Sequence, residues 1–446
     1  MKIQAPPGMR DFYPEDMRLQ NWLFDHWRSV SRSFGFSEYE GPIFEYLDLY
    51  RLKSGEGIVS ELFNFTDRGE RHFAIRPEMT PTLARMVAAR AGALPRPIKW
   101  FSIPRMCRAE KPQRGRLREF FQWNIDILGV EDTLADAEVV AVAAEFLRRV
   151  GLDAAHVVLR VNSRAIMAAA LATLGVPDAA RDGAFALIDR FDRLPPAEFD
   201  KQWEVLCGGS VGSAALRAFM GEASLERCLE LARGAGTTGQ EAAALFESFW
   251  LRLDELGVRA ACEFAPGVVR GLAYYTGIVF EAHLRSASLR ALLGGGRYDD
   301  LTGLLDGPRV PGVGFGMGDA PVIEALRELQ RLPQPEEMLD VFVIDAAPER
   351  FDQALKIAGR LRQASLAVDF SYKRQPIGKQ LKQATSRSAR FAVIVGTELA
   401  ERGELVVKDL VTGQQVGFAA EIFLGDAPGM LTRLRAAGTA PPPTGC

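Results

Sequence analysis

Six basic residues gather around one predicted hairpin, and they are of a type that binds phosphate or carboxylate groups. The hairpin joins two segments with strand-like patterns, 97–110 and 119–128. Its basic residues are Arg105, Arg108, Lys111, Arg114, Arg116 and Arg118. Because guanidinium groups hold phosphate and carboxylate oxygens through paired hydrogen bonds, this arrangement suits a polyphosphate. A basic hairpin is weak evidence by itself, so a solvated edge of a sheet stays an alternative.

The second of these segments, 119–128, places different side chains on its two faces. Successive residues of a strand point to opposite sides of the sheet. One face would carry Phe121, Trp123, Ile125 and Ile127, and the other would carry Phe120, Gln122, Asn124 and Asp126. An aromatic ring beside cations can accept a base ring, so Phe120 adds to the case for a nucleotide. A solvent-exposed strand would show the same alternation.

The composition describes a globular protein with an ample core. Its 446 residues are 48% hydrophobic, which is enough for two or three domains. The formal net charge is only −3, so any contact with nucleic acid would have to come from local basic patches. The first residues lack the apolar core of a signal peptide, and no later run is long and apolar enough to span a membrane. We therefore expect a cytoplasmic protein that does not contact a membrane.

The cysteines and histidines give no sign of a metal site or a disulfide framework. The five cysteines are scattered along the chain, and so are the four histidines. Structural zinc sites need paired ligands at short spacings, and disulfide scaffolds need many cysteines in a short chain. We expect no structural metal bound by the protein.

The N-terminal part of the chain predicts elements that would support the hairpin. Apolar residues at helical spacing predict a helix over 16–34. Further on, the run Arg76-Pro77-Glu78-Met79-Thr80 leads into a predicted helix that extends to residue 91. Thr80 or Thr82 is explained as a cap of that helix. Glu78 has no such structural explanation, which makes it a candidate for binding a ligand.

The middle of the chain predicts further strands around a long helical region. Residues 165–259 are rich in alanine and leucine and hold no cluster of catalytic residue types, so we interpret them as an inserted helical domain. That domain would cover the site or clamp a large substrate, and a purely structural role fits equally well. A strand over 268–284 is expected to pair with 290–293, ahead of three glycines at 294–296. These glycines, and those at alternate positions of 313–318, let a backbone approach a ligand closely.

A proline-containing linker at 331–338 separates two predicted parts of the chain. Residues 1–330 precede it. After it, strands and helices alternate over 339–435, which predicts a small α/β domain with a largely parallel sheet. Six basic residues that gather on one part of this domain mark either a nucleic-acid surface or only solvated helix faces. They are Lys373, Arg374, Lys379, Lys382, Arg387 and Arg390. The tail 436–446 is expected to be disordered.

Five motifs in order along the chain resemble the histidyl-tRNA synthetase family of class II aminoacyl-tRNA synthetases. They are Arg76-Pro-Glu-Met-Thr80, Arg108-Ala-Glu110 with the run from Pro112 to Phe120, Arg270-Gly-Leu-Ala-Tyr-Tyr275, Gly295-Gly-Arg-Tyr298 and Gly314-Phe-Gly-Met-Gly318. The resemblance covers nearly the whole chain. It implies an α+β catalytic domain with a six-stranded antiparallel sheet, a helical insertion, and a C-terminal α/β anticodon-binding-like domain that begins near Leu339. It also implies a homodimer, with Pro42 in the interface motif.

The same resemblance implies an enzyme that uses ATP and Mg²⁺ to join L-histidine to tRNA(His), and it suggests a role for each matched residue. The catalytic residues would be Arg108 and Arg270, on two sides of the α-phosphate of ATP. The histidine-binding residues would be Glu78, Thr80, Gln122, Asp126, Tyr274, Tyr275 and Tyr298. The ATP-binding residues would be Arg108, Glu110, Arg116, Phe120, Gly316 and Gly318, and the tRNA acceptor end would meet Gln113, Arg114 and Gly115.

Two positions depart from the family's pattern. Pro321 stands where the third motif ends in an arginine that packs on adenine and meets the γ-phosphate, and Ala273 stands where an aspartate is usual. Arg297 and Arg309 are candidates to replace the missing cation. These losses keep a second function open, because relatives of these enzymes act as non-catalytic regulators that sense histidine or uncharged tRNA. The retained C-terminal domain and basic hairpin favour the ligase.

Overall fold

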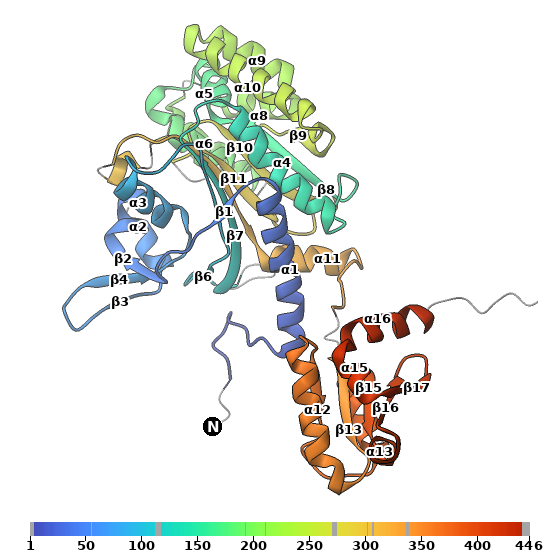
Figure 1. Ribbon diagram of the computed structural model, residues 1–446. Coiled ribbons are helices and arrows are strands. Elements are labelled where there is room, and N and C mark those ends of the chain that lie inside the picture. Colours follow the sequence, from blue (N-terminus) through green and yellow to red (C-terminus); the bar gives the residue numbers. More distant parts are fainter. Residues whose placement is uncertain are drawn as a thin grey trace, which may run out of the picture. The chain divides into compact units, whose positions relative to one another are not determined.

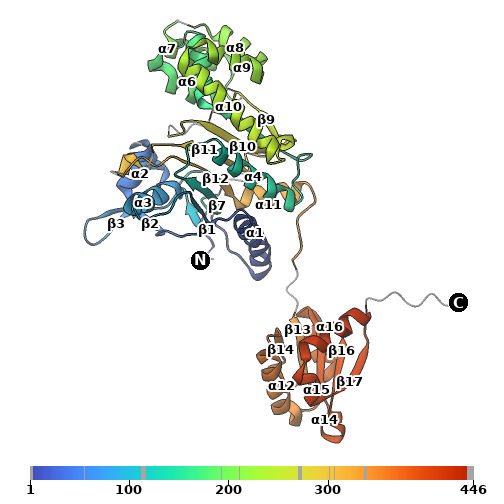
Figure 2. The same ribbon diagram turned by 45° about the horizontal axis from the view of Figure 1, so that its top comes forward.

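The structure is a computed structural model, and it describes residues 4–54, 56–111, 117–191, 193–209, 211–269, 274–300, 302–305, 307–335 and 339–438. The chain forms two compact units, Met1–Pro333 and Gln334–Cys446. The N-terminal unit contains a large sheet, a small sheet and most of the helices, and the C-terminal unit contains a sheet of its own (Figure 1, Figure 2). Each unit has its own hydrophobic core.

The large sheet is antiparallel through its centre. Its strand order is β1-β5-β7-β12-β11-β10-β8-β9. The strands are β1 (Ser37–Glu38), β5 (Ile98–Ser102), β7 (Glu119–Leu128), β12 (Gly312–Gly318), β11 (Leu293–Tyr298), β10 (Ile278–Leu284), β8 (Val157–Ser163) and β9 (Cys262–Phe264). The strands from β5 to β8 in this order pair antiparallel, and β1 and β9 add a parallel strand at each edge. The expected six-stranded antiparallel arrangement is therefore confirmed, with one extra strand on each side.

Of the two strands predicted for the basic hairpin, one is confirmed and the other is wrong. The second, 119–128, is confirmed at both ends as β7. The first, 97–110, is wrong as a single strand, because β5 ends at Ser102 and β6 (Arg105–Cys107) pairs separately with β7. Pro104 lies between β5 and β6. Since proline has no N–H to offer a neighbouring strand, it explains the interruption.

Helices α1 (Pro14–Ser33) and α4 (Leu134–Arg149) pack on one face of the large sheet (Figure 1). Trp27 of α1 stacks on Trp123 of β7 with ring centroids 5.9 Å apart, and Phe146 of α4 meets the same indole edge-on at 5.4 Å. The indole nitrogen of Trp123 donates to Ser31 Oγ at 3.0 Å. Because neighbouring residues of β7 point to opposite faces, this packing turns the polar side chains of β7 toward the other face.

The region between β8 and β9 in the chain is helical. Its described α-helices are α5 (Arg164–Thr173), α6 (Arg181–Ile188), α7 (Pro196–Cys207), α8 (Ser213–Glu222), α9 (Leu225–Gly234) and α10 (Thr237–Glu255). Figure 2 shows them grouped in green at one end of the unit. They are anchored to the sheet, because α5 packs against β8 and α10 packs against α4. The predicted helical insertion is confirmed.

Glycine-rich segments form strands in the centre of the large sheet. β11 contains the glycine triplet 294–296, and β10 begins only at Ile278. The prediction of a strand over 290–293 followed by the glycines is therefore wrong, since the glycines lie within the strand and pair with β10 and β12. Glycine has low strand propensity, which hid this strand in the sequence. Helix α11 (Asp319–Glu328) follows β12 directly.

A smaller sheet has the strand order β2-β4-β3. Its strands are β2 (Phe44–Tyr46), β4 (His72–Ile75) and β3 (Asn64–Thr66), and the neighbouring helices are α2 (Leu47–Ser54) and α3 (Thr80–Arg90). Buried Leu47, Tyr50, Leu62 and Ala74 form a local core beneath it. Helix α3 begins at Thr80, where the run that contains Glu78 ends.

The C-terminal unit has a mixed sheet with the strand order β14-β13-β15-β16-β17. Its strands are β13 (Leu339–Asp345), β14 (Val368–Phe370), β15 (Ala389–Val395), β16 (Glu404–Asp409) and β17 (Gln415–Ala419). Its helices are α12 (Phe351–Gln363), α13 (Ile377–Ser386), α14 (Thr397–Arg402), α15 (Ala420–Gly425) and α16 (Ala427–Gly438). The α/β class is confirmed, but the largely parallel sheet is wrong for β16 and β17, which pair antiparallel. The connections before them are too short for a parallel crossover.

Two further expectations concern the ends of the chain and its location. Helix α16 extends to Gly438, so residues 436–438 of the predicted disordered tail are helical, and 439–446 lie outside the described residues. Among the described helices, none is both long and apolar enough to cross a membrane. The cytoplasmic location stays a prediction.

Candidate active site

Two adjoining cavities open on the face of the large sheet opposite α1 and α4. The first has a volume of about 170 Å³ and is mostly polar. The side chains around it come from Glu78, Thr80, Arg108, Gln122, Asn124, Asp126, Tyr274, Tyr275 and Tyr298. All seven predicted histidine-binding residues therefore line one cavity. Asn124 was not singled out from the sequence, although its position on the polar face of β7 was a signal for it.

The second cavity, also of about 170 Å³, combines polar and apolar surface and is lined by the aromatic ring of Phe120. Its lining includes Leu117, Phe120, Leu292, Ala320 and Pro321, together with Gly316 and Gly318. It shares Arg108 and Gln122 with the first cavity. The two cavities thus run along β7, with Phe120 at one end and Asp126 at the other.

Arg108 lies where the two cavities meet. Its Nε donates to the carbonyl oxygen of Pro77 at 3.1 Å, and its guanidinium carbon lies 5.2 Å from the centroid of the Phe120 ring. The side chain is thus held between the run that carries Glu78 and the aromatic wall of the second cavity. A guanidinium at this junction is suited to stabilise negative charge that develops between a polar substrate and a nucleotide.

A buried hydrogen bond joins Tyr298 and Asp126 in the first cavity. The Tyr298 hydroxyl donates to Asp126 Oδ1 at 2.5 Å, and both residues are buried. Burial, reinforced by the charge of Asp126, holds the pKa of Tyr298 well above its usual value, so the phenol keeps its proton at neutral pH. Nearby, the Tyr274 hydroxyl donates to that of Tyr275 at 3.3 Å. The tyrosine hydroxyls and the Asp126 carboxylate together offer hydrogen-bond donors and acceptors for the nitrogen atoms of a substrate ring.

Glycines on β12 make room for these polar side chains. A Cβ added to Gly314 would lie 2.1 Å from Asp126 Oδ1 and 2.4 Å from the carbonyl oxygen of Ile125. A Cβ added to Gly316 would lie 2.6 Å from the side-chain nitrogen of Gln122. The side chains of β7 therefore lie directly over bare backbone of the neighbouring strand.

Arg76 holds the run that carries Glu78, although the side chain of Arg76 lines neither cavity. It is buried, and its guanidinium donates to Glu40 Oε1 at 2.5 Å, to the Gly41 carbonyl at 2.9 Å and to the Arg105 carbonyl at 3.0 Å. These bonds tie the run to β6 and to the segment before β2. Glu78 is thereby presented next to the N-terminal residue of α3, Thr80.

Several predicted site residues are not brought to the cavities or cannot be placed. Arg270, Gln113, Arg114, Gly115, Arg116 and the departure Ala273 lie outside the described residues. Glu110 is described, and its carbonyl accepts from Arg118 Nε at 3.0 Å, but it is not among the residues that line the two cavities. The roles suggested for all of these stay predictions.

The proposed replacements for the missing cation are wrong. The Arg297 guanidinium pairs with buried Asp136 instead of facing the second cavity, and Arg309 pairs with Asp300 at the surface, 2.9 Å away. Pro321 itself lines the second cavity, in the first turn of α11. The preceding Asp319 is buried and accepts from Arg10 Nη2 at 2.7 Å. Burial raises the pKa of Asp319, and Arg10 opposes that rise.

Comparisons with known proteins give consistent matches over the whole chain. A family model described as histidyl-tRNA synthetase matches residues 8–322, and one described as an anticodon binding domain matches residues 340–429. The chloroplastic/mitochondrial histidine–tRNA ligase of Arabidopsis thaliana is 38% identical over 93% of this chain and 84% of the relative. That of Thermoplasma volcanium is 36% identical over 93% of this chain and 96% of the relative. The crystal structure of histidyl-tRNA synthetase from Nostoc sp. PCC 7120 has a TM-score of 0.80 at 25% identity and covers 97% of this chain and 100% of that one.

An antiparallel sheet that carries joined polar and aromatic cavities, in a chain that continues into an anticodon-binding α/β unit, defines a class II aminoacyl-tRNA synthetase. The histidyl-tRNA synthetase model matches more than half of the chain, and the two relatives are more than 30% identical over most of their lengths. The chain belongs to the histidyl-tRNA synthetase family.

The glycine at 314 offers a test of this geometry. In a Gly314→Ala variant the new methyl group collides with the Asp126 carboxylate and with the backbone of Ile125, which cannot move aside. We expect histidine binding, measured by isothermal titration calorimetry, to weaken by about 100-fold or more. Gly92→Ala is the matched control, because an added Cβ there meets nothing within 4 Å. Affinity of Gly314→Ala within about threefold of the wild type would contradict the geometry.

Proposed function

We propose that this chain ligates histidine to tRNA(His) at the expense of ATP. In the first step the histidine carboxylate attacks the α-phosphorus of ATP and pyrophosphate leaves. In the second step the terminal ribose hydroxyl of the tRNA attacks the histidyl carbonyl and AMP leaves. The observation that carries the proposal is the position of Arg108, which lines both the polar cavity and the aromatic cavity. The reacting carboxylate and α-phosphate would meet at that junction.

Histidine is the amino acid that the polar cavity suits. Asp126 accepts hydrogen bonds and Tyr275 carries a hydroxyl, which together match the N–H and the bare nitrogen of a neutral imidazole. Glu78 supplies the negative charge for the substrate ammonium, with Thr80 and Gln122 beside it. A site that pairs with substrate nitrogens rejects analogues that lack them, because its own buried polar groups would be left unpaired.

Activation needs no enzyme nucleophile, since the attacking carboxylate of histidine is already ionised at neutral pH. The chain's task is to position the reactants and to stabilise charge at the α-phosphoryl group. Arg108 does this from the junction of the cavities, and we propose Arg270 as its partner. Among the described residues no group of three or more His, Cys, Asp or Glu side chains could hold a metal ion. Mg²⁺ typically binds through substrate phosphates with one or two carboxylates, so we propose that it enters with ATP.

Adenine would be held in the aromatic cavity without the usual arginine. Phe120 offers a ring face, and Pro321 and Leu117 offer apolar surface in the same cavity. Stacking and apolar contact are sufficient to hold a base, since every base has a π-face. What is lost is a cation near the γ-phosphate, which is part of the leaving group and not the site of attack.

A regulatory role is the second candidate, and the substitution at Pro321 is the observation that favours it. A protein that only senses histidine would need the polar cavity and could lose the cation that binds ATP. The same protein would not need Arg108 at the junction, nor an aromatic cavity joined to the histidine pocket. The ligase accounts for both cavities and is therefore the function we propose.

In the C-terminal unit, fewer basic residues are available to contact tRNA than the sequence suggested. Of the six basic residues that the sequence predicts to gather on one part of this unit, three are ion paired within it: Arg374 with Asp345, Arg387 with Asp369, and Arg390 with Asp409. The others, Lys373, Lys379 and Lys382, are exposed, and the neighbouring Tyr372 ring is 81% exposed. Lysines bind phosphates and an exposed ring stacks on an unpaired base, so we propose that this surface contacts the anticodon arm.

The small sheet exposes an aromatic face that suits a second copy of the chain. Phe44, Tyr46 and Phe65 are between 42% and 54% exposed, and all pack around Phe73. A cluster of large exposed apolar side chains typically marks an interaction site. Pro42, which the family resemblance places in the interface motif, lies just before β2. We propose that this face forms a homodimer.

Pyrophosphate exchange tests the first step without tRNA. The purified chain should exchange labelled pyrophosphate into ATP with histidine and with no other amino acid. Glu78→Gln should raise the KM for histidine by about 10- to 100-fold, because it removes the charge that pairs with the ammonium. Glu204→Gln, an exposed position on α7, is the control and should match the wild type. Histidine binding without any exchange would reject the ligase and favour the regulator.

The lysine surface predicts a defect that is confined to tRNA. The double variant Lys379→Ala/Lys382→Ala should raise the KM for tRNA(His) in aminoacylation by about tenfold and leave pyrophosphate exchange unchanged. Lys356→Ala, an exposed lysine on α12, is the matched control. An unchanged KM for tRNA would show that this surface does not bind it, and an equal loss of exchange would point to a general defect instead.

The homodimer predicts a sedimenting mass of twice the 49.0 kDa chain. A Phe44→Asp variant places a charge in the aromatic face and should sediment as a monomer. Val411→Asp alters an exposed apolar residue of the other unit and should leave the dimer intact. A wild-type chain that sediments as a monomer at micromolar concentration would contradict the proposal.

A further inference from the structure

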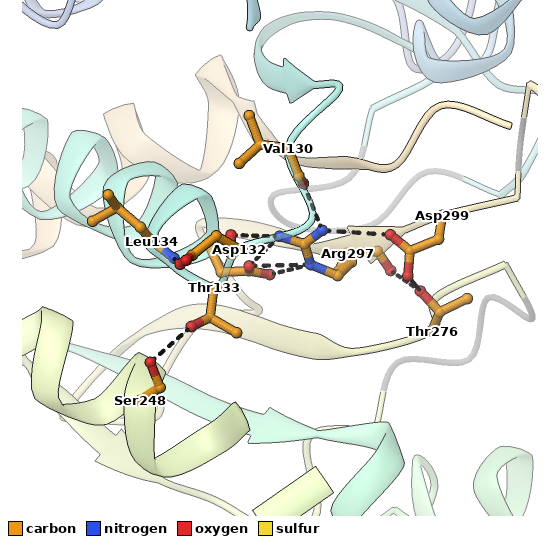
Figure 3. Close-up of polar contacts among 9 residues, drawn as sticks. Val130, Asp132, Thr133, Leu134, Ser248, Thr276, Arg297 and Asp299 are labelled. Carbon is orange, nitrogen blue, oxygen red and sulfur yellow. Dashed lines mark hydrogen bonds and ion pairs between the residues drawn. The ribbon is translucent and has the colours of Figure 1, made fainter. Parts of the chain in front are cut away.

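Arg297 is the centre of a polar cluster behind the polar cavity, in which the Arg297 and Asp136 side chains are buried and Thr276 is exposed (Figure 3). Its Nε donates to both carboxylate oxygens of Asp136, at 3.0 and 3.1 Å, and its Nη2 also donates to Asp136. The remaining bonds go to the carbonyl of Val130 at 3.0 Å, the carbonyl of Asp132 at 3.2 Å, and Asp299 Oδ1 at 3.4 Å. Every nitrogen of the guanidinium is therefore engaged.

Two hydrogen bonds made by Thr276 extend the cluster to the segment that carries Tyr274 and Tyr275. The Thr276 hydroxyl donates to Asp299 Oδ2 at 2.7 Å, and the Thr276 backbone N–H donates to the Arg297 carbonyl at 2.9 Å. Figure 3 shows Asp299 between Thr276 and Arg297, and in contact with both. We refer to Thr276 and Asp299 as the tyrosine arm of the cluster, because Thr276 directly follows Tyr275 in the chain.

Three members of the cluster are close in sequence to residues that line the polar cavity. Val130 is in the loop that follows β7, the strand that carries Asp126. Arg297 immediately precedes Tyr298, and Thr276 immediately follows Tyr275. Three segments that are separate in sequence, and that supply the groups facing the imidazole, are thus joined behind the pocket to a single guanidinium.

The cluster does not itself touch the substrate. Residues Thr276, Arg297 and Asp299 line a different cavity, of about 380 Å³, which is also lined by Phe246 of α10. Tyr275 and Tyr298 line the pocket on the other side. This division follows from the strand geometry, because Arg297 and Tyr298 are neighbours on β11 and point to opposite faces.

We propose that Arg297 is a positioning residue for histidine recognition, and that its tyrosine arm sets the position of Tyr275 relative to Asp126 and Tyr298. The proposal deepens the function proposed above and rests on it. Hydrogen-bond recognition is sensitive to placement, since a shift of a few tenths of an ångström weakens a short bond such as that between Tyr298 and Asp126. A loosened arm should therefore affect histidine and leave ATP alone.

The arm is a better place to test the proposal than Arg297 itself. The Asp136 side chain is completely buried and paired with the Arg297 guanidinium, and burial raises the pKa of Asp136 while Arg297 opposes that rise. Removing Arg297 would leave that carboxylate buried without a partner and could unfold the chain. Thr276→Val removes only the hydroxyl, keeps the shape of the side chain and preserves the backbone bond to Arg297.

The experiment compares Thr276→Val with Thr276→Ser, which restores the hydroxyl, and with Thr133→Val. Thr133 lines the same 380 Å³ cavity, but its hydroxyl donates to Ser248 on α10, away from the arm. In pyrophosphate exchange we expect Thr276→Val to raise the KM for histidine by about tenfold, with the KM for ATP within about twofold of the wild type. Thr276→Ser and Thr133→Val should both resemble the wild type. Histidine affinity from isothermal titration should follow the same order.

The outcomes separate this inference from the proposed function. If the wild type shows no exchange, the proposed function fails, and histidine affinity alone decides the inference. An unchanged histidine affinity in Thr276→Val overturns the inference, and so does an equal rise of both KM values, which indicates a general loss of structure. Failure of Thr276→Ser to restore the wild-type KM overturns it as well.

Discussion

The close approach of β12 to the polar side chains of β7 is the constraint on which the site depends. In the sheet register Gly314 lies opposite Asp126, and the Asp126 carboxylate occupies the space that a Cβ of residue 314 would fill. A carboxylate buried in this way is costly unless it is paired. Tyr298, from the next strand β11, supplies the partner at 2.5 Å. Gly314, Asp126 and Tyr298 therefore have to be present together.

The order of the strands in the sheet brings these residues together at the cavities. Strands β7, β12 and β11 are neighbours in the sheet, yet β7 is separated from the other two by the whole helical insertion. The face of β7 that packs on Trp27 and Phe146 builds the core, so the opposite face must carry the chemistry. Arg108 then connects the polar end of that face to its aromatic end. One face of β7 thus builds the core, and its other face lines the two cavities.

The sequence predicted the parts of the site that a single strand contains, and failed where distant segments meet. The alternation along β7 placed Phe120, Gln122, Asn124 and Asp126 on one face from local pattern alone. The set of residues around the polar cavity came from the family resemblance, because nothing local connects Glu78 to Tyr298. Arg297 was misassigned as a possible phosphate ligand, since its partner Asp136 is 161 residues away and pairs with it only in the fold. The strand β11 was missed because its glycines contradict strand propensity, and their reason is visible only when neighbouring side chains are in place.

The most direct test of the ligase is charging of unfractionated tRNA by the purified chain with labelled histidine and ATP. It requires the polar cavity, the aromatic cavity and the C-terminal unit to act in one reaction, in spite of Pro321. Histidine esterified to the 3′ end of one tRNA species is the expected result, and it should depend on ATP. Histidine that binds the chain but is never transferred to tRNA would contradict the ligase, and would mean that a histidine pocket has been retained for another purpose.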